Sequence, residues 1–218
     1  MNYRGYKFLD EQCTRRSAEV LTMLPKESLL QFEKRCDNLG FTLTDSRNLI
    51  DHYKFLSEEL IQADLETKRH PNLYLMCVNI INDFNIASLV RNGSSMGCRE
   101  IILYGDKKFD RRGCVGANHY TNFKHVKNLS EFEGIRKDFD VIVSLENCAG
   151  SQSIYNYQWP YDKKMLLIVG QESIGVPGEF LEISDVILEI PLTSCLRSIN
   201  VASAGAIALY SYNSQMPV

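Results

Sequence analysis

The sequence predicts an α/β fold with a mostly parallel sheet of five or six strands, covered by helices on both faces and preceded by a small helical N-terminal segment. From residue 72 onward, apolar strand-like runs alternate with helical stretches, which is the pattern of a parallel sheet with crossover helices. Two of these runs, 165–169 and 186–190, each end in a small or polar loop. Ligands bind at the carboxyl ends of such strands, so we expect the functional site there.

Length and composition favour a soluble, cytoplasmic protein. The chain has 218 residues, 44% of them hydrophobic, which is enough for an ordinary buried core. No apolar run approaches the roughly 18–20 residues that cross a bilayer, and the N-terminus carries charges where a signal peptide needs its apolar region. We therefore expect no membrane partner.

The cysteines and the charges exclude some classes of site. Seven scattered cysteines without a CxxC pair favour reduced buried thiols over a zinc ribbon or a disulfide framework, and no metal site is predicted. A net charge of −3 does not indicate a nucleic-acid binder, so an RNA partner requires local clusters of basic residues. Two clusters qualify, although each could equally be a solvated loop: Lys107, Lys108, Arg111 and Arg112, and Lys68, Arg69 and His70.

Residues 1–70 are expected to form a helical extension without a catalytic motif. Pro25 and Glu27 suit the first turn of a helix that stops at Gly40, and Thr44 or Asp45 is expected to cap a second helix. The second helix would carry one apolar stripe, made of Leu49, Tyr53, Leu56 and Leu60. The extension is expected to pack against the main domain or a symmetry mate, or alternatively to bind substrate. We expect the boundary at Lys68–Pro71, with the second domain spanning 71–218.

The second domain is expected to contain its elements in the following order. Strands are predicted at 73–81, 100–104, 123–126, 141–145, 165–169 and 186–190. Helices are predicted at 85–96, after the first strand, and at 199–212, after the last.

The loop after the first strand disfavours a conventional dinucleotide fold. It reads NDFNIASLVRNGSSMG, without the glycine-rich turn that lets backbone approach a phosphate. It offers instead Asn82, Asp83 and Asn85 at a helix start, with Arg91 six residues after Asn85. Arg91 is either a surface residue or a fixed cation at a site.

Two further motifs follow the last two strands. In Gly170-Gln171-Glu172-Ser173-Ile174-Gly175-Val176-Pro177 the glycines allow tight turns, and Glu172 is either a helix cap or a functional carboxylate. The segment from Ile190 to Val201 ends in Ser198 and Asn200 at the start of the final helix, where Ser198 could also be only an N-cap.

Together these three stretches resemble the signature motifs of the SpoU branch of the SPOUT methyltransferases: Asn and, six residues later, Arg; then G-x-E-x-x-G; then I-P-x(7)-S-x-N before a small-residue helix. The match covers about residues 72–214. The resemblance implies a C-terminal trefoil knot, a homodimer, and S-adenosylmethionine as cofactor. It also implies methylation of a ribose 2′-hydroxyl in structured RNA rather than action on DNA.

The resemblance also implies site residues. The implied catalytic residues are Asn85, Arg91, Glu172, Ser198 and Asn200. The implied cofactor-binding residues are Leu145, Glu146, Gly170, Gly175, Ile190, Leu192, Leu196 and Ser198. Arg197, directly before Ser198, is similar to members that methylate the D-loop guanosine of tRNA, which favours tRNA over ribosomal RNA.

The role of Arg91 can be narrowed by chemistry. A ribose hydroxyl is a weak acid, so the protein must align it and help to remove its proton. Arginine is normally protonated, so Arg91 is expected to orient a phosphate or the 2′-hydroxyl, whereas the resemblance implies a base-like role; both stay open.

The chain departs from the family pattern at Ala87 and Asn92, where Gly and Thr are usual, and at Ser194, where Gly is usual. A catalytically silent subunit that binds RNA or a partner methyltransferase is therefore the alternative function. A small-molecule α/β enzyme unrelated to methylation is a third, remote alternative.

Overall fold

The computed structural model describes residues 2–3, 6–7, 27, 29–38, 47–105 and 108–216. The chain divides into two compact units, Met1–Thr67 and Lys68–Val218. In the described residues, no helix combines the length and the apolar character that a membrane span requires.

The N-terminal unit contains short elements. Strands β1 (Asn2–Tyr3) and β2 (Tyr6–Lys7) pair antiparallel, and helix α2 spans Leu29–Asn38. The 3-10 turn η1 (Asp51–Tyr53) and helix α3 (Glu58–Lys68) follow. Pro25, Gly40, Thr44 and Asp45, which we used to predict helix ends, lie outside the described residues.

The prediction of one continuous second helix through Leu49 and Leu60 is wrong. Phe55 has a φ of 66°, in the left-handed region, which interrupts a right-handed helix at that point. The helix begins after Ser57, whose hydroxyl accepts a hydrogen bond from the Leu60 amide at 3.2 Å. An apolar spacing that suits a helix was therefore overruled by the cap at Ser57.

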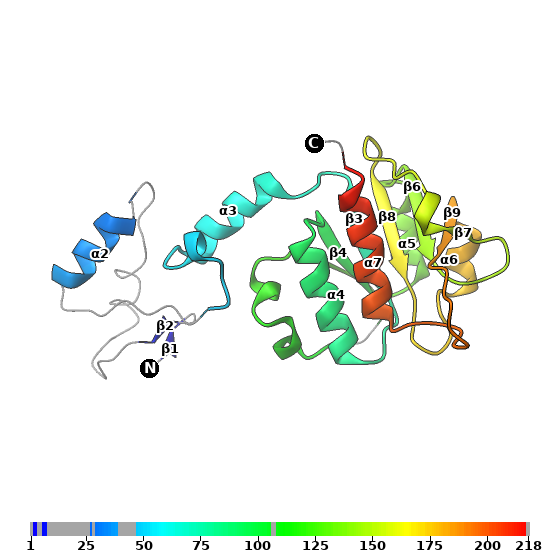
Figure 1. Cartoon of the computed structure of the whole chain (residues 1–218), viewed down its shortest axis with the longest axis horizontal. Helices are drawn as coiled ribbons and strands as arrows, with labels where there is room; N and C mark the ends of the chain where they lie inside the picture. The colour runs from blue at the N-terminus through cyan, green and yellow to red at the C-terminus, as the bar shows by residue number, and fades with distance from the viewer. Residues whose placement is uncertain are drawn as a thin grey trace. The chain divides into compact units, whose positions relative to one another are not determined.

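The second unit is built on a seven-stranded sheet in the order β5-β4-β3-β8-β6-β9-β7, with every pair parallel (Figure 1). The strands are β3 (Leu73–Val78), β4 (Glu100–Tyr104), β5 (Phe123–Val126), β6 (Val141–Leu145), β7 (Gln152–Ser153), β8 (Met165–Val169) and β9 (Val186–Glu189). The predicted mostly parallel sheet is confirmed. The seventh strand, β7, has two residues and is too short to show a periodic pattern.

Helices cover both faces of this sheet. On one face lie α4 (Asp83–Ser95) and α7 (Val201–Ser214), side by side in Figure 1; on the other lie α5 (Leu129–Arg136) and α6 (Gly178–Glu182). Side chains of β3 alternate between the two cores: Leu75 packs with the first pair of helices and Met76 with the second. The described residues of the unit also form the 3-10 turns η2 (Arg111–Cys114), η3 (Ala117–His119) and η4 (Ile154–Asn156).

Helix α7 needs small residues because it packs closely on α4. A Cβ atom at Gly205 would lie 2.5 Å from Leu89 Cδ2 of α4. Asn92 of α4 also donates a hydrogen bond to the Ala202 carbonyl at 3.3 Å. These contacts fix the start of α7, and with it the loop that precedes the helix.

The described cysteines differ in burial. Cys77, Cys98 and Cys114 are buried, whereas Cys148 is partly buried and Cys195 is exposed. Burial raises the pKa of the Cys77 thiol to about 12, so this thiol stays protonated at neutral pH. The expectation of buried thiols therefore holds for three of the five cysteines whose side chains the structure describes.

Candidate active site

Three polar residues from the three motifs form one hydrogen-bonded chain at the carboxyl edge of the sheet. Asn200 donates from Nδ2 to Asn85 Oδ1 at 2.9 Å. Asn85 in turn donates from its own Nδ2 to Glu172 Oε1 at 2.8 Å. The side-chain amide of Asn85 therefore uses both its oxygen and its nitrogen, and the orientation of this side chain is fixed by partners on both sides. The chain joins segments separated by 115 and 87 residues.

Glu172 ends this chain and holds the loop after β3. Its carboxylate also accepts hydrogen bonds from the backbone amides of Ile81 at 2.9 Å and Asn82 at 3.0 Å. Partial burial of Glu172 raises its pKa, but the bonds from Asn85, Ile81 and Asn82 outweigh burial, and the net effect lowers the pKa below its ordinary value of 4.5. Glu172 is therefore a carboxylate that fixes a loop, rather than a proton acceptor near neutral pH.

Asn200, and not Ser198, caps helix α7. Its Oδ1 accepts from the amides of Ala202 at 2.9 Å and Ser203 at 3.2 Å, so the helix begins at Val201 instead of residue 199. Ser198 is free of this role and lies in the wall of the cavity described below.

The loop after β8 is shaped by two glycines that leave no room for a side chain. A Cβ atom at Gly170 would lie 2.1 Å from the backbone carbon of Gly175, across the short bridge between Gln171 and Gly175. Gly175 has a φ of 72°, and a Cβ atom there would lie 2.0 Å from Glu146 Oε2. The same oxygen accepts from the Val176 amide at 2.7 Å, so Glu146 holds this loop against the end of β6.

These loops enclose a cavity of about 590 Å³, within the usual range for a small-molecule site. Seven of the eight predicted cofactor-binding residues line it: Leu145, Glu146, Gly170, Gly175, Ile190, Leu192 and Ser198. Glu172 and Asn200 of the polar chain line it as well. Leu196 does not line the cavity, and 67% of its surface is exposed.

The wall also contains residues that were not predicted to bind the cofactor. Asn147, Glu189 and Arg197 line the cavity, and Asn147 Nδ2 donates to the Arg197 carbonyl at 3.2 Å. Asn147 and Glu189 are located by the same signal as the others, because each lies at the carboxyl end of a strand, β6 or β9.

Arg91 lies away from this wall. Six residues along a helix correspond to about 240° of rotation, and Arg91 accordingly points away from the direction of Asn85. It is exposed, does not line the cavity, and its side chain forms no hydrogen bond or ion pair within the described ranges. The structure of one chain therefore assembles Asn85, Glu172 and Asn200 but not Arg91.

The departures from the family pattern have structural partners. Ala87 is fully buried on α4, where the Cβ atom of a residue replacing Gly113 would lie only 2.7 Å from the Ala87 Cβ. Asn92 bonds to the Ala202 carbonyl of α7, and the Ser194 hydroxyl accepts from the Leu196 amide at 3.2 Å. Neither Ala87 nor Asn92 lines the cavity.

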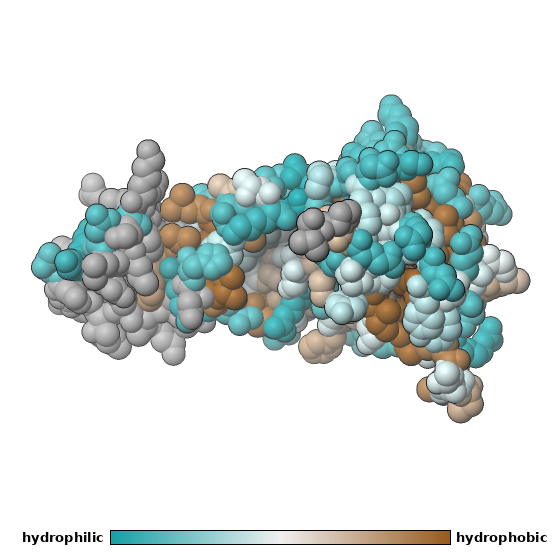
Figure 2. Space-filling view, turned by 45° about the horizontal axis from the view of Figure 1, so that its top comes forward, coloured by the Kyte–Doolittle hydropathy of each residue, from teal (hydrophilic) through white to brown (hydrophobic). Residues whose placement is uncertain are grey.

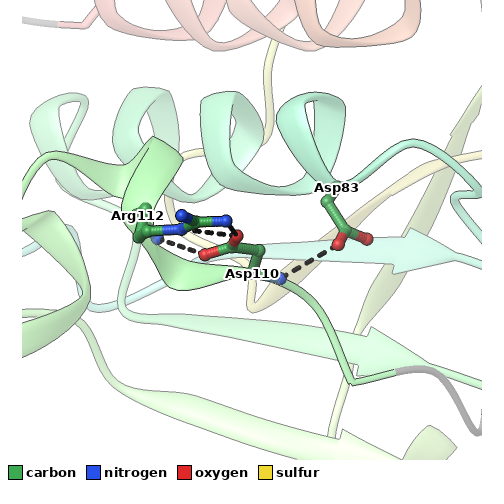
Figure 3. Close-up of polar contacts among 3 residues, drawn as sticks. All are labelled: Asp83, Asp110 and Arg112. Carbon is green, nitrogen blue, oxygen red and sulfur yellow. Dashed lines mark hydrogen bonds and ion pairs between the residues drawn. The ribbon is translucent and has the colours of Figure 1, made fainter.

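The two basic clusters differ in how they are engaged. In the loop after β4, the Asp110 amide donates to Asp83 Oδ2 at 3.2 Å, and Asp110 binds the guanidinium of Arg112, with Nε to Oδ2 at 2.7 Å (Figure 3). Arg111 beside them is exposed, whereas Lys107 lies outside the described residues. In the other cluster, Arg69 donates to the Tyr120 carbonyl and His70 bonds to Asn213, so both have structural roles.

The cavity has the chemical character that a nucleoside-containing cofactor requires. Leu145, Leu188, Ile190 and Leu192 supply apolar walls for a flat base. Gly170 and Gly175 bring bare backbone to the surface, and the carboxylates of the wall suit a cationic ligand.

Comparison with known proteins relates residues 72–210 to the SpoU rRNA Methylase family. A tRNA (guanosine(18)-2′-O)-methyltransferase of Aquifex aeolicus is 28% identical over 156 residues, which are 68% of this chain and 72% of that protein. The mouse tRNA (guanosine(18)-2′-O)-methyltransferase TARBP1 is 23% identical; the match covers 72% of this chain but 11% of that protein.

Solved structures of methyltransferases are similar to this chain as well. The crystal structure of the A. aeolicus TrmH/SpoU tRNA modifying enzyme superposes with a TM-score of 0.64 at 26% identity and covers 72% of this chain and 83% of that one. An AdoMet-bound rRNA methyltransferase from Sinorhizobium meliloti has a TM-score of 0.62 at 20% identity, covering 71% and 61%, and shows the same fold.

Proposed function

Because the chain belongs to the SpoU rRNA Methylase family, we propose that it transfers a methyl group from S-adenosylmethionine to a ribose 2′-hydroxyl of RNA. The observation that carries this proposal is the hydrogen-bonded chain of Asn200, Asn85 and Glu172, which unites the three motifs beside the cavity. Relatives named as tRNA and 23S rRNA 2′-O-methyltransferases support the same reaction.

The cavity wall is the proposed cofactor site. Leu145, Ile190 and Leu192 would hold the adenine, and the loop from Gly170 to Gly175 would approach the ribose. When bound there, S-adenosylmethionine supplies an activated methyl group on a sulfonium that is a good leaving group. The protein then has to exclude water, align the hydroxyl and help to remove its proton.

Ser198 and Asn200 are the proposed positioning groups for the ribose. Both lie in the wall, and Asn200 is held by its bonds to Asn85 and to the start of α7. Arg91 is the proposed contact to RNA: its guanidinium is an exposed cation, so it would orient a phosphate or the 2′-hydroxyl by charge-assisted hydrogen bonds.

We favour tRNA over ribosomal RNA as the substrate. Support comes from the A. aeolicus relative, named as a tRNA enzyme, and from Arg197, which precedes Ser198 in the wall. Ribosomal RNA is the alternative, since a Coxiella burnetii relative at 25% identity is named as a 23S rRNA enzyme. A structured RNA substrate of either kind favours a cytoplasmic location.

A homodimer and a trefoil knot are further parts of this proposal. Apolar side chains remain exposed on the second unit, including Phe84 at 76%, Ile174 at 67% and Tyr210 at 65%. Figure 2 shows hydrophobic patches between hydrophilic surface on the face in view. A second copy of the chain would cover such patches. Light scattering coupled to size exclusion tests this point, and a strictly monomeric protein would contradict the dimer.

The proposed domain boundary lies after residue 70, between a helical N-terminal extension and a methyltransferase domain at 71–218. Deleting residues 1–70 and measuring cofactor affinity and RNA affinity tests the division. We expect the cofactor affinity to be unchanged, and a lower RNA affinity would assign substrate binding to the extension.

The decisive experiment is incubation with labelled S-adenosylmethionine and total RNA, followed by mapping of ribose methylation in any RNA that becomes labelled. Incorporation into a ribose 2′-position is expected.

Arg91→Ala should lower turnover by about 10² to 10⁴ with the cofactor affinity retained. Calorimetry tests the silent-subunit alternative, because a chain that binds no S-adenosylmethionine and labels no RNA would fit that role. Ala87 and Asn92, two of the departures that motivate this alternative, pack against Gly113 and Ala202 and do not line the cavity.

A further inference from the structure

The charged groups of the cavity wall are unbalanced. The charged residues that line it are three glutamates, Glu146, Glu172 and Glu189, and one arginine, Arg197. The wall therefore carries a formal charge of about −2 when all four groups are ionised.

Two of the three carboxylates are already engaged by donors that shape the loops. Glu172 accepts three N–H groups, from Ile81, Asn82 and Asn85. Glu146 accepts two backbone amides, from Asn147 at 3.0 Å and from Val176 at 2.7 Å. Replacing either would disturb the loops, so neither can report on the ligand alone.

Of the three carboxylates in the wall, Glu189 accepts the fewest hydrogen bonds. Its Oε2 lies 2.8 Å from the Ser151 hydroxyl, which also lies 2.8 Å from the Cys148 carbonyl. A hydroxyl has one hydrogen to donate, so Ser151 cannot serve both acceptors at once. The Glu189 Oε1 atom receives no hydrogen bond within the described part of the chain. Glu189 therefore keeps capacity to interact with a cation in the cavity.

We propose that Glu189 makes this cavity discriminate between the cofactor and its product by charge; this rests on the proposed function. S-adenosylmethionine carries an ammonium, a carboxylate and a sulfonium, with a net charge of +1. Methyl transfer from that sulfonium leaves the S–CH₃ electron pair on sulfur as a neutral thioether, and the product S-adenosylhomocysteine has a net charge of zero. A carboxylate in the wall attracts the first ligand more than the second.

The expected size of this effect follows from Coulomb's law. A unit charge about 7 Å from another, at an effective dielectric constant of about 40, changes affinity by roughly five- to tenfold. The cavity would thereby favour binding of fresh cofactor and release of product. Glu189 is in this sense a specificity-determining residue, and it lies outside the three motifs.

The experiment is titration calorimetry on the full chain with S-adenosylmethionine and S-adenosylhomocysteine in turn. In Glu189→Gln we expect the Kd of S-adenosylmethionine to rise about five- to tenfold and the Kd of S-adenosylhomocysteine to stay within about twofold. Glu182→Gln is the matched control, because Glu182 is exposed on α6 and does not line the cavity; neither Kd should change in this variant.

Three outcomes overturn the proposal or its basis. Equal weakening of both ligands assigns Glu189 to a group that they share, and no change in either excludes a role; each result refutes charge discrimination. Failure of the wild-type chain to bind either ligand instead refutes the proposed function. If Glu189→Gln does not fold, the salt dependence of the wild type decides: raising salt must weaken S-adenosylmethionine but not S-adenosylhomocysteine.

Discussion

The two edges of the parallel sheet are built in different ways. At the carboxyl edge, side chains of one loop bind the backbone of another loop far along the chain, as Glu172 does with Ile81 and Asn82. At the amino edge, long side chains pack on aromatic rings: Lys164 Nζ lies 4.9 Å from the ring centroid of Tyr74 and 5.4 Å from that of Phe139.

The two edges differ in how well they tolerate an added or altered side chain. The amino edge also has a pocket, of about 210 Å³, lined by mixed charges that include Arg99, Lys124 and Lys164 together with Glu100 and Asp138. Flexible lysines can adjust there without moving backbone. The carboxyl edge has directed hydrogen bonds and glycines without free space, so one added atom has to displace backbone. A pocket alone therefore does not identify a functional site. The carboxyl-edge pocket differs because the loops around it have no room to change their backbone conformation.

The largest effect is expected for Gly170→Ala. The added Cβ would meet the Gly175 carbon at 2.1 Å and the Val176 nitrogen at 2.2 Å, both of them backbone atoms. We expect a loss of about 3 kcal/mol in the free energy of unfolding and a cofactor affinity lower by more than about tenfold. Urea denaturation and calorimetry measure the two. Gly178→Ala is the control, because its Cβ would meet nothing within 4 Å; equal losses in both variants would contradict the comparison.

A smaller effect is expected for Asn200→Ala. This change removes the cap of α7 and the bond to Asn85, each worth about 1 kcal/mol, so we expect about 2 kcal/mol less stability. The cofactor affinity should fall as well. Asn128→Ala removes only a cap, since Asn128 accepts from Glu131 at the start of α5 at 3.0 Å, and should cost about 1 kcal/mol. If the two variants lose the same amount, the carboxyl-edge chain adds nothing to stability.

Glu172 gives the carboxyl edge a dependence on pH. Its pKa is lowered in the folded protein, so the unfolded chain binds its proton first as the pH falls. The stabilisation is fully present above the ordinary value of 4.5 and is lost as the pH falls through the lower value of the folded state. Urea midpoints between pH 3 and 7 should therefore decline less steeply at the acid end in Glu172→Gln than in the wild type. Parallel curves would show that Glu172 is not coupled to folding.

The smallest effect is expected at the amino edge. Lys164→Met keeps most of the side-chain stem but removes the charge above Tyr74 and Phe139, and should cost about 0.5–1 kcal/mol. Thermal unfolding measures this loss, and calorimetry should find the cofactor affinity unchanged. A lower affinity in this variant would break the distinction between the edges.

The sequence predicted the central strand β8 well because full burial leaves a continuous apolar run, whereas the predicted strand 73–81 was too long: β3 ends at Val78, before Asn79 with its left-handed φ of 50°. All five residues of β8, Met165–Val169, are buried, and its predicted limits are those observed. The second N-terminal helix failed for the opposite reason: apolar spacing alone does not reveal the left-handed Phe55. The edge strand β7 is too short for any pattern.

The candidate site was predictable where a motif supplies both the residue and its neighbours along the chain. Glu172, Asn200 and Gly170 lie in the cavity wall as the motifs predicted. Asn147 and Glu189 were missed as wall residues because they lie outside the three motifs, although each lies at the carboxyl end of a strand. The roles assigned to all of the site residues stay predictions, and two of these residues, Arg91 and Leu196, do not line the cavity of one chain.

The bonds that span 87 and 115 residues also bear on how the protein folds. Closing loops of this length carries a large entropic penalty before any contact offsets it, so such contacts form late and slow folding. The pairing of β3 with β8 spans a comparable distance, from Leu73 to Met165, and it positions the loops, so the side-chain bonds between loops form only after this central pair. We expect near-native secondary structure to appear ahead of the ability to bind cofactor during refolding, with ligand binding as the last property recovered.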